Sequence, residues 1–340
     1  MSDLDEEALA RWMRGSIPGG PALRTVDKFA GGQSNPTYRI GTAGGTYVLR
    51  RKPFGRLLPS AHAVEREFRL MSALHPTGFP VPRPVALCED QAVIGSAFYL
   101  MEMVEGRTFW DGTLPALSKA DRHACYEAMI DTVAALHSID PRTVGLGDFG
   151  RPGKYVARQV DRWTKQYRAA QTEDIPEVEK LIEWLPSTLP EQADASIIHG
   201  DYRIDNLIFA ADRPQVRAVL DWELATIGDP LADFAYLAMC WVMPRDGRAG
   251  LADVDLAGTG VPTLEEIVAR YCAATGRSGL PDLHWYFAYN LFRAVGIIQG
   301  IKKRVIDGNA SSPQAAETVA RLLPIARAGW MQARIAGASG

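Results

Sequence analysis

Short apolar runs that end in charged residues mark the middle of the chain. Residues 197–198 and 207–209 are apolar, residues 216–220 are apolar except for Arg217, and the last of these runs is followed directly by Asp221. Runs of this length, bounded by polar residues, predict short buried strands that present charged side chains at their ends. The polar loop after the first run contains Asp201. The pattern therefore predicts a strand, a polar loop and a hairpin that bring carboxylates together.

Elsewhere the pattern predicts strands first and helices afterwards. An amphipathic helix is expected over residues 61–74, where apolar residues recur on one face. After Gly106 the helical period dominates, and residues 234–243 are apolar on most sides, which predicts a buried helix. The expected N-terminal strands are residues 24–29, 36–40, 46–51, 85–88 and 97–103.

Composition narrows the class of protein. The 340 residues are 47% hydrophobic and 23% charged, which excludes wholesale disorder, and a net charge of −3 gives no reason to expect nucleic acid or an anionic membrane as partner. No apolar run approaches the ~20 residues that span a bilayer. The acidic N-terminus is unlike a secretory signal, and we expect a cytoplasmic protein. The four cysteines are widely spaced, which predicts free thiols.

The central loop has the residue types that phosphoryl transfer requires. The chain reads His199-Gly200-Asp201, then Asn206 five residues after the aspartate, then Asp221 beyond the hairpin. Transfer from ATP needs a carboxylate near the acceptor hydroxyl and oxygen ligands for Mg²⁺ beside the phosphates. Aspartate and asparagine are also common in ordinary turns, but their joint spacing here favours a site.

These motifs resemble those of a known family. The H-G-D sequence, the Asp221-Trp222-Glu223 tripeptide and residues 227–235 resemble the aminoglycoside phosphotransferase and choline kinase-like family. The YRIDN sequence at 202–206 is most similar to the branch related to kinase-like domains associated with acyl-CoA dehydrogenases. The resemblance extends from about Val26 to the C-terminal helices.

The resemblance implies an α+β, bilobal protein-kinase-like fold. Residues 1–103 would form a nucleotide-covering N-terminal lobe with an antiparallel sheet. Residues 104–340 would form a larger, mainly helical lobe for catalysis and acceptor binding, with ATP between the lobes. The expected cofactors are ATP and Mg²⁺, and the expected reaction is transfer of the γ-phosphoryl group to a hydroxyl of a small molecule.

Four residues of the central motifs receive roles from the resemblance. Asp201 would be the catalytic carboxylate, and Arg203 would contact the γ-phosphate. Asn206 and Asp221 would hold Mg²⁺.

A glycine-containing segment between the first two strands is a candidate phosphate-covering loop. Gly31, Gly32 and Ser34 lie in it, and such a loop can approach a triphosphate closely with its amides. Alone it would be read as a plain hairpin, because it departs from the kinase G-x-G-x-x-G pattern. The strand and helix that follow it favour the phosphate-covering role.

The remaining nucleotide contacts follow from the family pattern. Arg50 stands where kinases carry a lysine, and arginine is not a geometric substitute for lysine. Its partner would be Glu65 or Glu67, and the alignment favours Glu67. Glu102 and Met103 resemble the hinge between kinase lobes, where adenine bonds to backbone groups; the amide used could be that of Met103 or of its successor.

Three further charged residues have expected supporting roles. The resemblance implies that Asp229 braces the catalytic loop through backbone amides and that Asp233 has a similar buried role. Arg293 lies in an otherwise apolar helical segment. It could bind an anionic group of the acceptor, neutralise an acidic pocket or form a structural ion pair.

The acceptor itself is suggested only by analogy. The YRIDN branch suggests a hydroxylated acyl-CoA or a related metabolite. The alternatives are an aminoglycoside or choline-type phosphotransferase, a nucleotide-binding pseudokinase, and a module that pairs with a separate acyl-CoA dehydrogenase.

Overall fold

The computed structural model describes residues 4–29, 35–54, 62–192, 194–245, 249–309 and 314–339. The chain divides into two compact units. The first comprises Met1–Arg107, Val144–Leu146 and Asn206–Ala225, and the second comprises the remaining segments, Thr108–Thr143, Gly147–Asp205 and Thr226–Gly340.

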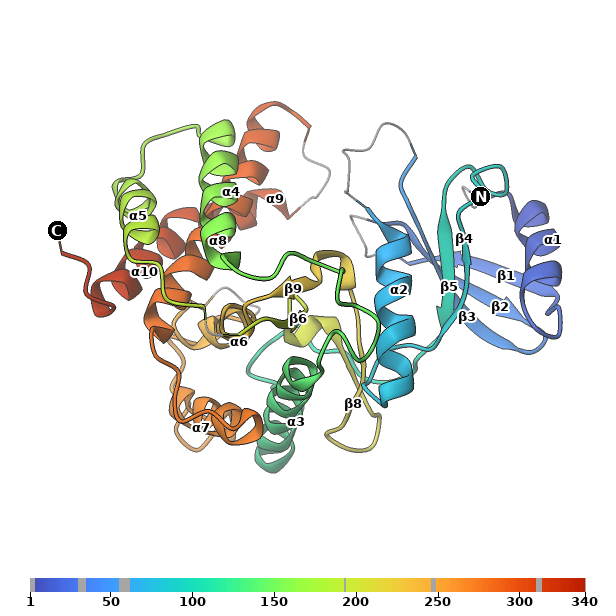
Figure 1. The fold of residues 1–340 in the computed structure, drawn as a ribbon, viewed down its shortest axis with the longest axis horizontal. Coiled ribbons are helices and arrows are strands. Elements are labelled where there is room, and N and C mark those ends of the chain that lie inside the picture. The colour runs from blue at the N-terminus through green and yellow to red at the C-terminus, as the bar shows by residue number, and fades with distance from the viewer. Residues whose placement is uncertain are drawn as a thin grey trace. The chain divides into compact units, whose positions relative to one another are not determined.

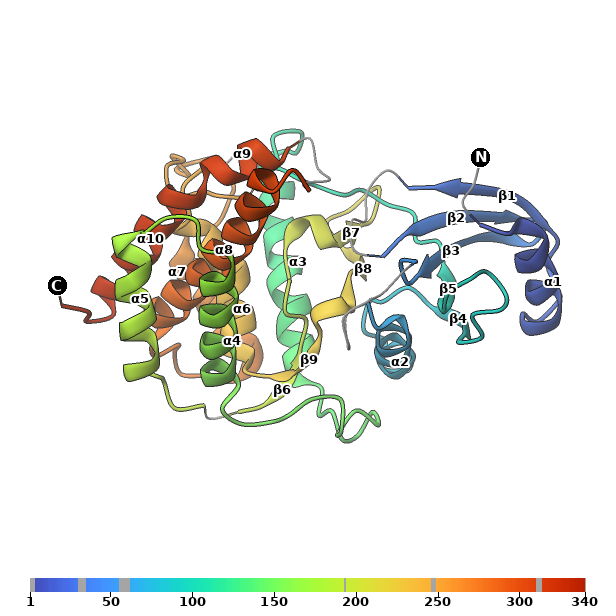
Figure 2. The ribbon, with the colours of Figure 1, turned by 90° about the horizontal axis from the view of Figure 1, so that it is seen from above.

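The first unit contains an antiparallel five-stranded sheet in the order β1-β2-β3-β5-β4, which Figure 2 shows. Figure 1 shows α2 (Val64–Leu74) and α1 (Glu6–Ser16) on either side of this sheet. The strands are β1 (Leu23–Lys28), β2 (Thr37–Thr42), β3 (Gly45–Arg51), β4 (Pro84–Cys88) and β5 (Phe98–Glu102).

Alternation along β3 decides which residues form the core and which face α2. Leu49 is fully buried in an apolar cluster with Leu9 and Met13 of α1. Since successive strand residues point to opposite faces, the next residue, Arg50, points to the other side of the sheet. There it meets Glu67 of α2, whose start at Val64 lies within the predicted helix.

The short hairpin of β7 (Leu207–Phe209) and β8 (Val216–Val219) also belongs to the first unit. The backbone explains this, because the Val219 N–H donates to the Pro80 carbonyl and the Arg107 N–H donates to the Phe209 carbonyl, each at 2.8 Å. The sequence predicts one boundary after residue 103. The compact units differ from that prediction, because hydrogen bonds join residues 206–225 to the N-terminal segment.

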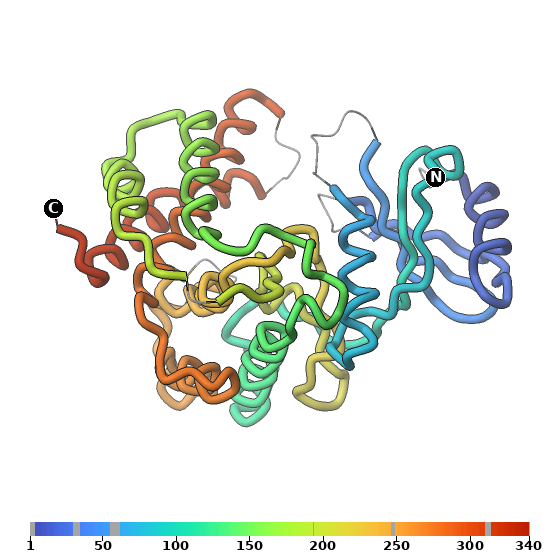
Figure 3. Tube along the Cα trace, in the orientation of Figure 1, coloured from blue at the N-terminus to red at the C-terminus, as the bar shows by residue number. Residues whose placement is uncertain are grey.

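The second unit is mainly helical and has α8 (Leu283–Ile306) at its centre. Figure 3 shows α4 and α5 (green) beside the C-terminal helices (red). A two-stranded ladder of β6 (Ser196–Ile198) and β9 (Thr226–Gly228) leads into and out of the central motifs. The other helices are α3 (Lys119–Ser138), α4 (Tyr155–Ala170), α5 (Pro176–Ser187), α6 (Pro230–Ala238), α7 (Leu264–Thr275), α9 (Ala315–Ala320) and α10 (Leu322–Ile335).

Short 3-10 turns complete the secondary structure at His75–Thr77, Ile204–Asn206, Trp222–Leu224 and Met239–Trp241. The predicted fold class, an antiparallel N-terminal sheet followed by a mainly helical C-terminal region, is confirmed. All four cysteines are free, as predicted. Within the described ranges, no helix is both long enough and apolar enough to cross a membrane.

Candidate active site

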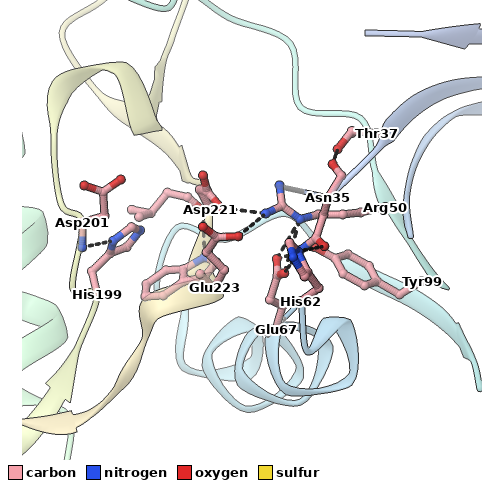
Figure 4. Close-up of polar contacts among 12 residues, drawn as sticks. Asn35, Thr37, Arg50, His62, Glu67, Tyr99, His199, Asp201, Asp221 and Glu223 are labelled. Atoms are coloured by element: carbon pink, nitrogen blue, oxygen red, sulfur yellow. Dashed lines mark hydrogen bonds and ion pairs between the residues drawn. The ribbon is translucent and has the colours of Figure 1, made fainter. Parts of the chain in front are cut away.

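Arg50 is the centre of a charged cluster in the first unit. Its Nε lies 3.0 Å from Glu67 Oε2, and its Nη2 lies 2.7 Å from Asp221 Oδ1 and 3.7 Å from Glu223 Oε2. Figure 4 shows the guanidinium between these carboxylates. Of the two candidate partners on α2, Glu67 therefore contacts Arg50, whereas Glu65 pairs with Lys52 at 2.8 Å.

Glu67 is held on several sides in a buried position. Arg50 and Tyr99 are paired in the register of β3 and β5, so both point to the same face, and the Tyr99 hydroxyl donates to Glu67 Oε2 at 3.1 Å. Asn35 Nδ2 donates to Glu67 Oε1 at 3.0 Å, and Asn35 Oδ1 lies 3.0 Å from His62 Nδ1 (Figure 4). Burial raises the pKa of Glu67 to about 7, and the charge of Arg50 opposes that rise.

Arg50 keeps its positive charge in this cluster. Burial disfavours the charged form of Arg50, but Glu67, Tyr99 and Asp221 more than compensate and raise its pKa. One guanidinium faces the three carboxylates of Glu67, Asp221 and Glu223.

Asn206 and Asp221, the two predicted metal ligands, flank the same end of the β7–β8 hairpin. The Leu220 N–H donates to the Asn206 carbonyl at 2.8 Å, one residue before Asp221. Asp221 has φ 64° and ψ 62°, a left-handed conformation that aspartate tolerates better than most residues. No group of three or more His, Cys, Asp or Glu among the described residues could hold a metal ion. One amide and one carboxylate nevertheless suit Mg²⁺, which keeps several waters or phosphate oxygens.

In the second unit, Asp233 of α6 holds the start of the predicted catalytic loop. Its two carboxylate oxygens accept from the backbone N–H groups of His199 and Gly200, each at 2.8 Å. His137 Nε2 lies 3.1 Å from the same carboxylate, and His137 Nδ1 lies 2.7 Å from the Tyr271 hydroxyl. Burial alone would raise the pKa of Asp233, but these hydrogen bonds and the nearby histidines lower it.

The predicted brace at Asp229 is wrong. Asp229 is the N-cap of α6, where its carboxylate accepts from the Leu231 N–H at 2.9 Å and from the Tyr286 hydroxyl at 2.7 Å. Since α6 begins at Pro230, Asp229 lies just outside the helix and Asp233 lies one turn inside it, where it meets the loop amides. Burial raises the pKa of Asp229, and the bonds from Tyr286 and Leu231 only partly offset the rise.

Asp201 itself contacts His199, Tyr236 and Arg203. Its N–H donates to His199 Nδ1 at 3.1 Å, and its Oδ1 accepts from the Tyr236 hydroxyl at 2.6 Å (Figure 4 shows the first). Arg203 Nε lies 3.5 Å from Asp201 Oδ1, and its Nη2 lies 2.8 Å from Asp205 Oδ2. Burial works against the charge of Arg203, but Asp201, Tyr236 and Asp205 raise its pKa. The predicted pair of catalytic residues is therefore in contact.

The positions of the other predicted nucleotide-binding residues do not by themselves indicate a nucleotide contact. The Glu102 side chain pairs with Arg83 at 3.0 Å and is half exposed. The Met103 N–H donates to the Thr46 carbonyl at 3.2 Å, so the sheet already uses that amide. Gly31, Gly32 and Ser34 lie outside the described residues.

Arg293 and Tyr236 complete the surroundings of the loop. Arg293 Nη2 donates to the Gly200 carbonyl at 2.6 Å, and the guanidinium carbon lies 4.5 Å from the centroid of the Tyr236 ring. Sequence reasoning missed Tyr236, together with Tyr99, Asn35 and the position of Glu223 beside Arg50. The signal for Tyr236 was its spacing of three residues from Asp233, which places both on one face of a helix.

Comparisons with known proteins fit this geometry. Residues 25–285 match the sequence model of the Phosphotransferase enzyme family. Acyl-CoA dehydrogenase family member 10 of Mus musculus is 44% identical over 319 residues, which are 93% of this chain but only 30% of that protein. The chain therefore spans less than a third of the length of this relative.

Solved structures resemble the chain over almost all of its length. A candidate aminoglycoside phosphotransferase from Ralstonia eutropha JMP134 has a TM-score of 0.89 at 48% identity, with 98% of this chain and 99% of that chain covered. A thermostable mutant of aminoglycoside phosphotransferase APH(4)-Ia, solved with ADP and hygromycin B, has a TM-score of 0.62 at 16% identity, with 96% and 98% covered. The second likeness concerns the fold alone. The family match over most of the chain, together with the loop and hairpin described above, shows that this chain belongs to the phosphotransferase enzyme family.

Proposed function

We propose that the chain is an ATP- and Mg²⁺-dependent kinase that transfers the γ-phosphoryl group of ATP to a hydroxyl of a small molecule. The observation that carries the proposal is the cluster in which Arg50 contacts both Glu67 and Asp221. Protein kinases place a strand lysine, a helix glutamate and a metal-binding aspartate around the phosphates, and in this chain Arg50 takes the place of the lysine. ADP is bound in the APH(4)-Ia structure, which supports ATP as the donor.

The catalytic role belongs to Asp201 in this proposal. Asp201 orients the acceptor hydroxyl and accepts its proton. The hydroxyl oxygen forms a bond to the γ-phosphorus while the bond from that phosphorus to the bridging oxygen breaks, so that ADP leaves. Arg203, which lies 3.5 Å from Asp201, contacts the γ-phosphate and balances charge that develops on it.

Asn206 and Asp221 are the residues that would hold Mg²⁺. Their oxygens are hard ligands of the kind that Mg²⁺ prefers. When bound, the ion would neutralise phosphate charge and align the phosphates. Asp221 now contacts Arg50 at 2.7 Å, and we infer that Arg50 turns toward the α- and β-phosphates when nucleotide binds.

The rest of the nucleotide site follows from the family resemblance. The resemblance assigns contacts with the phosphates to Gly31, Gly32 and Ser34, which lie outside the described residues, and Glu67 holds Arg50. The Glu102 carbonyl and an amide near Met103 receive the adenine. Because the Met103 N–H already donates to Thr46, the amide of the next residue is the better candidate.

The acceptor we propose is a hydroxyacyl-CoA or a related metabolite. Support comes from the 44% identity to a part of acyl-CoA dehydrogenase family member 10, whose name points to acyl-CoA chemistry in the same polypeptide. A separate acyl-CoA dehydrogenase could then act with this chain. An aminoglycoside acceptor is the second candidate, favoured by the likeness to the Ralstonia eutropha protein.

A panel of acceptors tests the proposal. The chain with MgATP is incubated with 4-hydroxyacyl-CoAs, aminoglycosides and choline-like alcohols, and phosphorylated products are identified by mass spectrometry, with Asp201→Asn as the paired control. Phosphorylation of a hydroxyacyl-CoA that is lost in the variant supports the full proposal. Phosphorylation of aminoglycosides alone replaces the acceptor, and no product from any alcohol refutes the kinase proposal for these acceptor classes.

A further inference from the structure

Tyr236 makes a hydrogen bond to the carboxylate that is proposed to orient the acceptor. Its hydroxyl donates to Asp201 Oδ1 at 2.6 Å, a length typical of a charge-assisted O–H···O⁻ bond. Burial, together with the negative charge of Asp201, raises the pKa of Tyr236. The hydroxyl therefore keeps its proton at neutral pH and acts as the donor. Such a bond restricts rotation of the Asp201 carboxylate about its last side-chain torsion.

Arg293 contacts Tyr236 and the backbone directly before Asp201. Its guanidinium carbon lies 4.5 Å from the Tyr236 ring centroid and 5.6 Å from that of Trp163. Its Nη2 donates at 2.6 Å to the carbonyl of Gly200, the residue directly before Asp201. A single side chain of α8 thus holds the aromatic ring on α6 and the backbone of the catalytic loop.

The environment of Arg293 is unusual for a charged group. The side chain is only 5% exposed, and no ion pair of Arg293 is present among the residues that the structure describes. Its Nε is buried without a hydrogen-bond partner in the same set. A buried charge is costly unless it is compensated. The compensation here comes from the Gly200 carbonyl, from aromatic faces and from the charge of Asp201, all of which favour a guanidinium.

We propose that Tyr236 is a positioning residue for Asp201, and that Arg293 holds both Tyr236 and the backbone before Asp201 in place. The inference rests on the proposed function, because it concerns the reaction of Asp201. The Tyr236 hydroxyl fixes the orientation in which Asp201 meets the acceptor. Arg293 fixes the position of Tyr236 through its ring and that of Asp201 through the preceding carbonyl.

Kinetics of matched variants test the proposal. Tyr236→Phe removes only the hydroxyl, and we expect kcat for phosphoryl transfer to fall about 10- to 100-fold, since small misplacements of a reacting group have effects of that size. KM for ATP should change by less than about twofold, because ground-state binding of nucleotide is not touched. Arg293→Lys should lose part of kcat and Arg293→Met more. The control is Tyr126→Phe, which removes the hydroxyl of another buried tyrosine, one that donates to the Gly112 carbonyl at 2.5 Å, and its kcat should equal that of wild type.

NMR spectroscopy tests the contact between Tyr236 and Asp201 without requiring enzymatic turnover. With tyrosines labelled at ¹³Cζ, the signal missing in Tyr236→Phe identifies Tyr236, and Asp201→Asn should shift that signal while leaving the Tyr126 signal in place. Asp161→Asn, in an exposed pair with Lys165, should shift neither.

The outcomes separate the two proposals. An unshifted Tyr236 signal in Asp201→Asn, or a kcat of Tyr236→Phe equal to that of wild type, overturns the positioning role. A wild-type chain that transfers phosphate to no acceptor refutes the proposed function instead, and the tyrosine signal then decides the contact alone. If Tyr236→Phe does not fold, the kcat of Arg293→Lys still decides, and a value equal to that of wild type overturns the supporting role of Arg293.

Discussion

Replacement of Asp233 by asparagine should destabilise the second unit more than replacement of most charged residues. In the structure this carboxylate accepts two backbone N–H groups, those of His199 and Gly200, and lies 3.1 Å from His137. An asparagine of the same shape can accept from only one of the two amides, and its NH₂ would face the other. One buried N–H is then unpaired, at a cost of about 1–3 kcal/mol, and the remaining bond loses its charge assistance.

The sum of these effects is about 3 kcal/mol, near the lower limit for breaking a buried charged network. Urea unfolding followed by circular dichroism measures it. With a slope of about 3 kcal/mol per molar, the midpoint should fall by roughly 1 M. The control is Asp161→Asn, whose exposed pair with Lys165 should contribute no more than about 0.5 kcal/mol. If the urea midpoint of Asp233→Asn equals that of Asp161→Asn, this carboxylate does not hold the loop.

Three other predictions follow from the same geometry. Asp229 has a raised pKa, so near its titration the folded chain retains a proton that the unfolded chain releases. The free energy of unfolding should therefore fall as the pH rises above about 4. Asp229→Asn should remove this pH dependence from urea midpoints measured between pH 4 and 7. Asp221→Asn should weaken ATP binding in the presence of Mg²⁺ by about tenfold or more but leave binding in EDTA nearly unchanged, as calorimetry can measure; equal losses in both conditions would contradict a metal-ligand role. Arg50→Met should raise KM for ATP, and an unchanged KM would argue against a contact between Arg50 and phosphate. The same substitution leaves Glu67 buried without its ion-pair partner, which should destabilise the first unit by about 3 kcal/mol in thermal unfolding.

Local patterns of the sequence were sufficient for the central motifs. The strand, loop and hairpin around Asp201 and Asp221 depend on neighbours in the chain, and the predicted elements are present in the structure. The same holds for the helix that carries Glu67, because its apolar period is a local property. These parts of the fold and of the candidate site could be predicted because short segments determine them.

The supporting contacts could not be predicted in this way. Asp229 and Asp233 are both acidic and lie four residues apart, and only the start of α6 at Pro230 decides which one meets the loop amides. Arg293 reaches the Gly200 carbonyl across 93 residues of sequence, so its role depends on how α8 packs beside α6. Packing between distant segments depends on the whole core. The hydrophobic periodicity of one segment does not show which other segment it packs against.

The grouping of the hairpin with the N-terminal segment was missed for a similar reason. The sequence places residues 206–225 within the later, mainly helical part of the chain. Backbone hydrogen bonds from Val219 to Pro80 and between Arg107 and Phe209 join the hairpin to the first unit. As a result Asn206 and Asp221 belong to the same compact unit as Arg50, while Asp201 belongs to the other.

Acceptor-dependent release of ADP would show whether Asp201 catalyses phosphoryl transfer to a hydroxyl. Wild-type chain and Asp201→Asn are compared with saturating MgATP and a 4-hydroxyacyl-CoA, and ADP is measured by a coupled assay. We expect ADP release that depends on both the acceptor and Mg²⁺ and that falls by at least about 100-fold in the variant. Equal rates for the two proteins would contradict the assignment of Asp201 as the catalytic carboxylate.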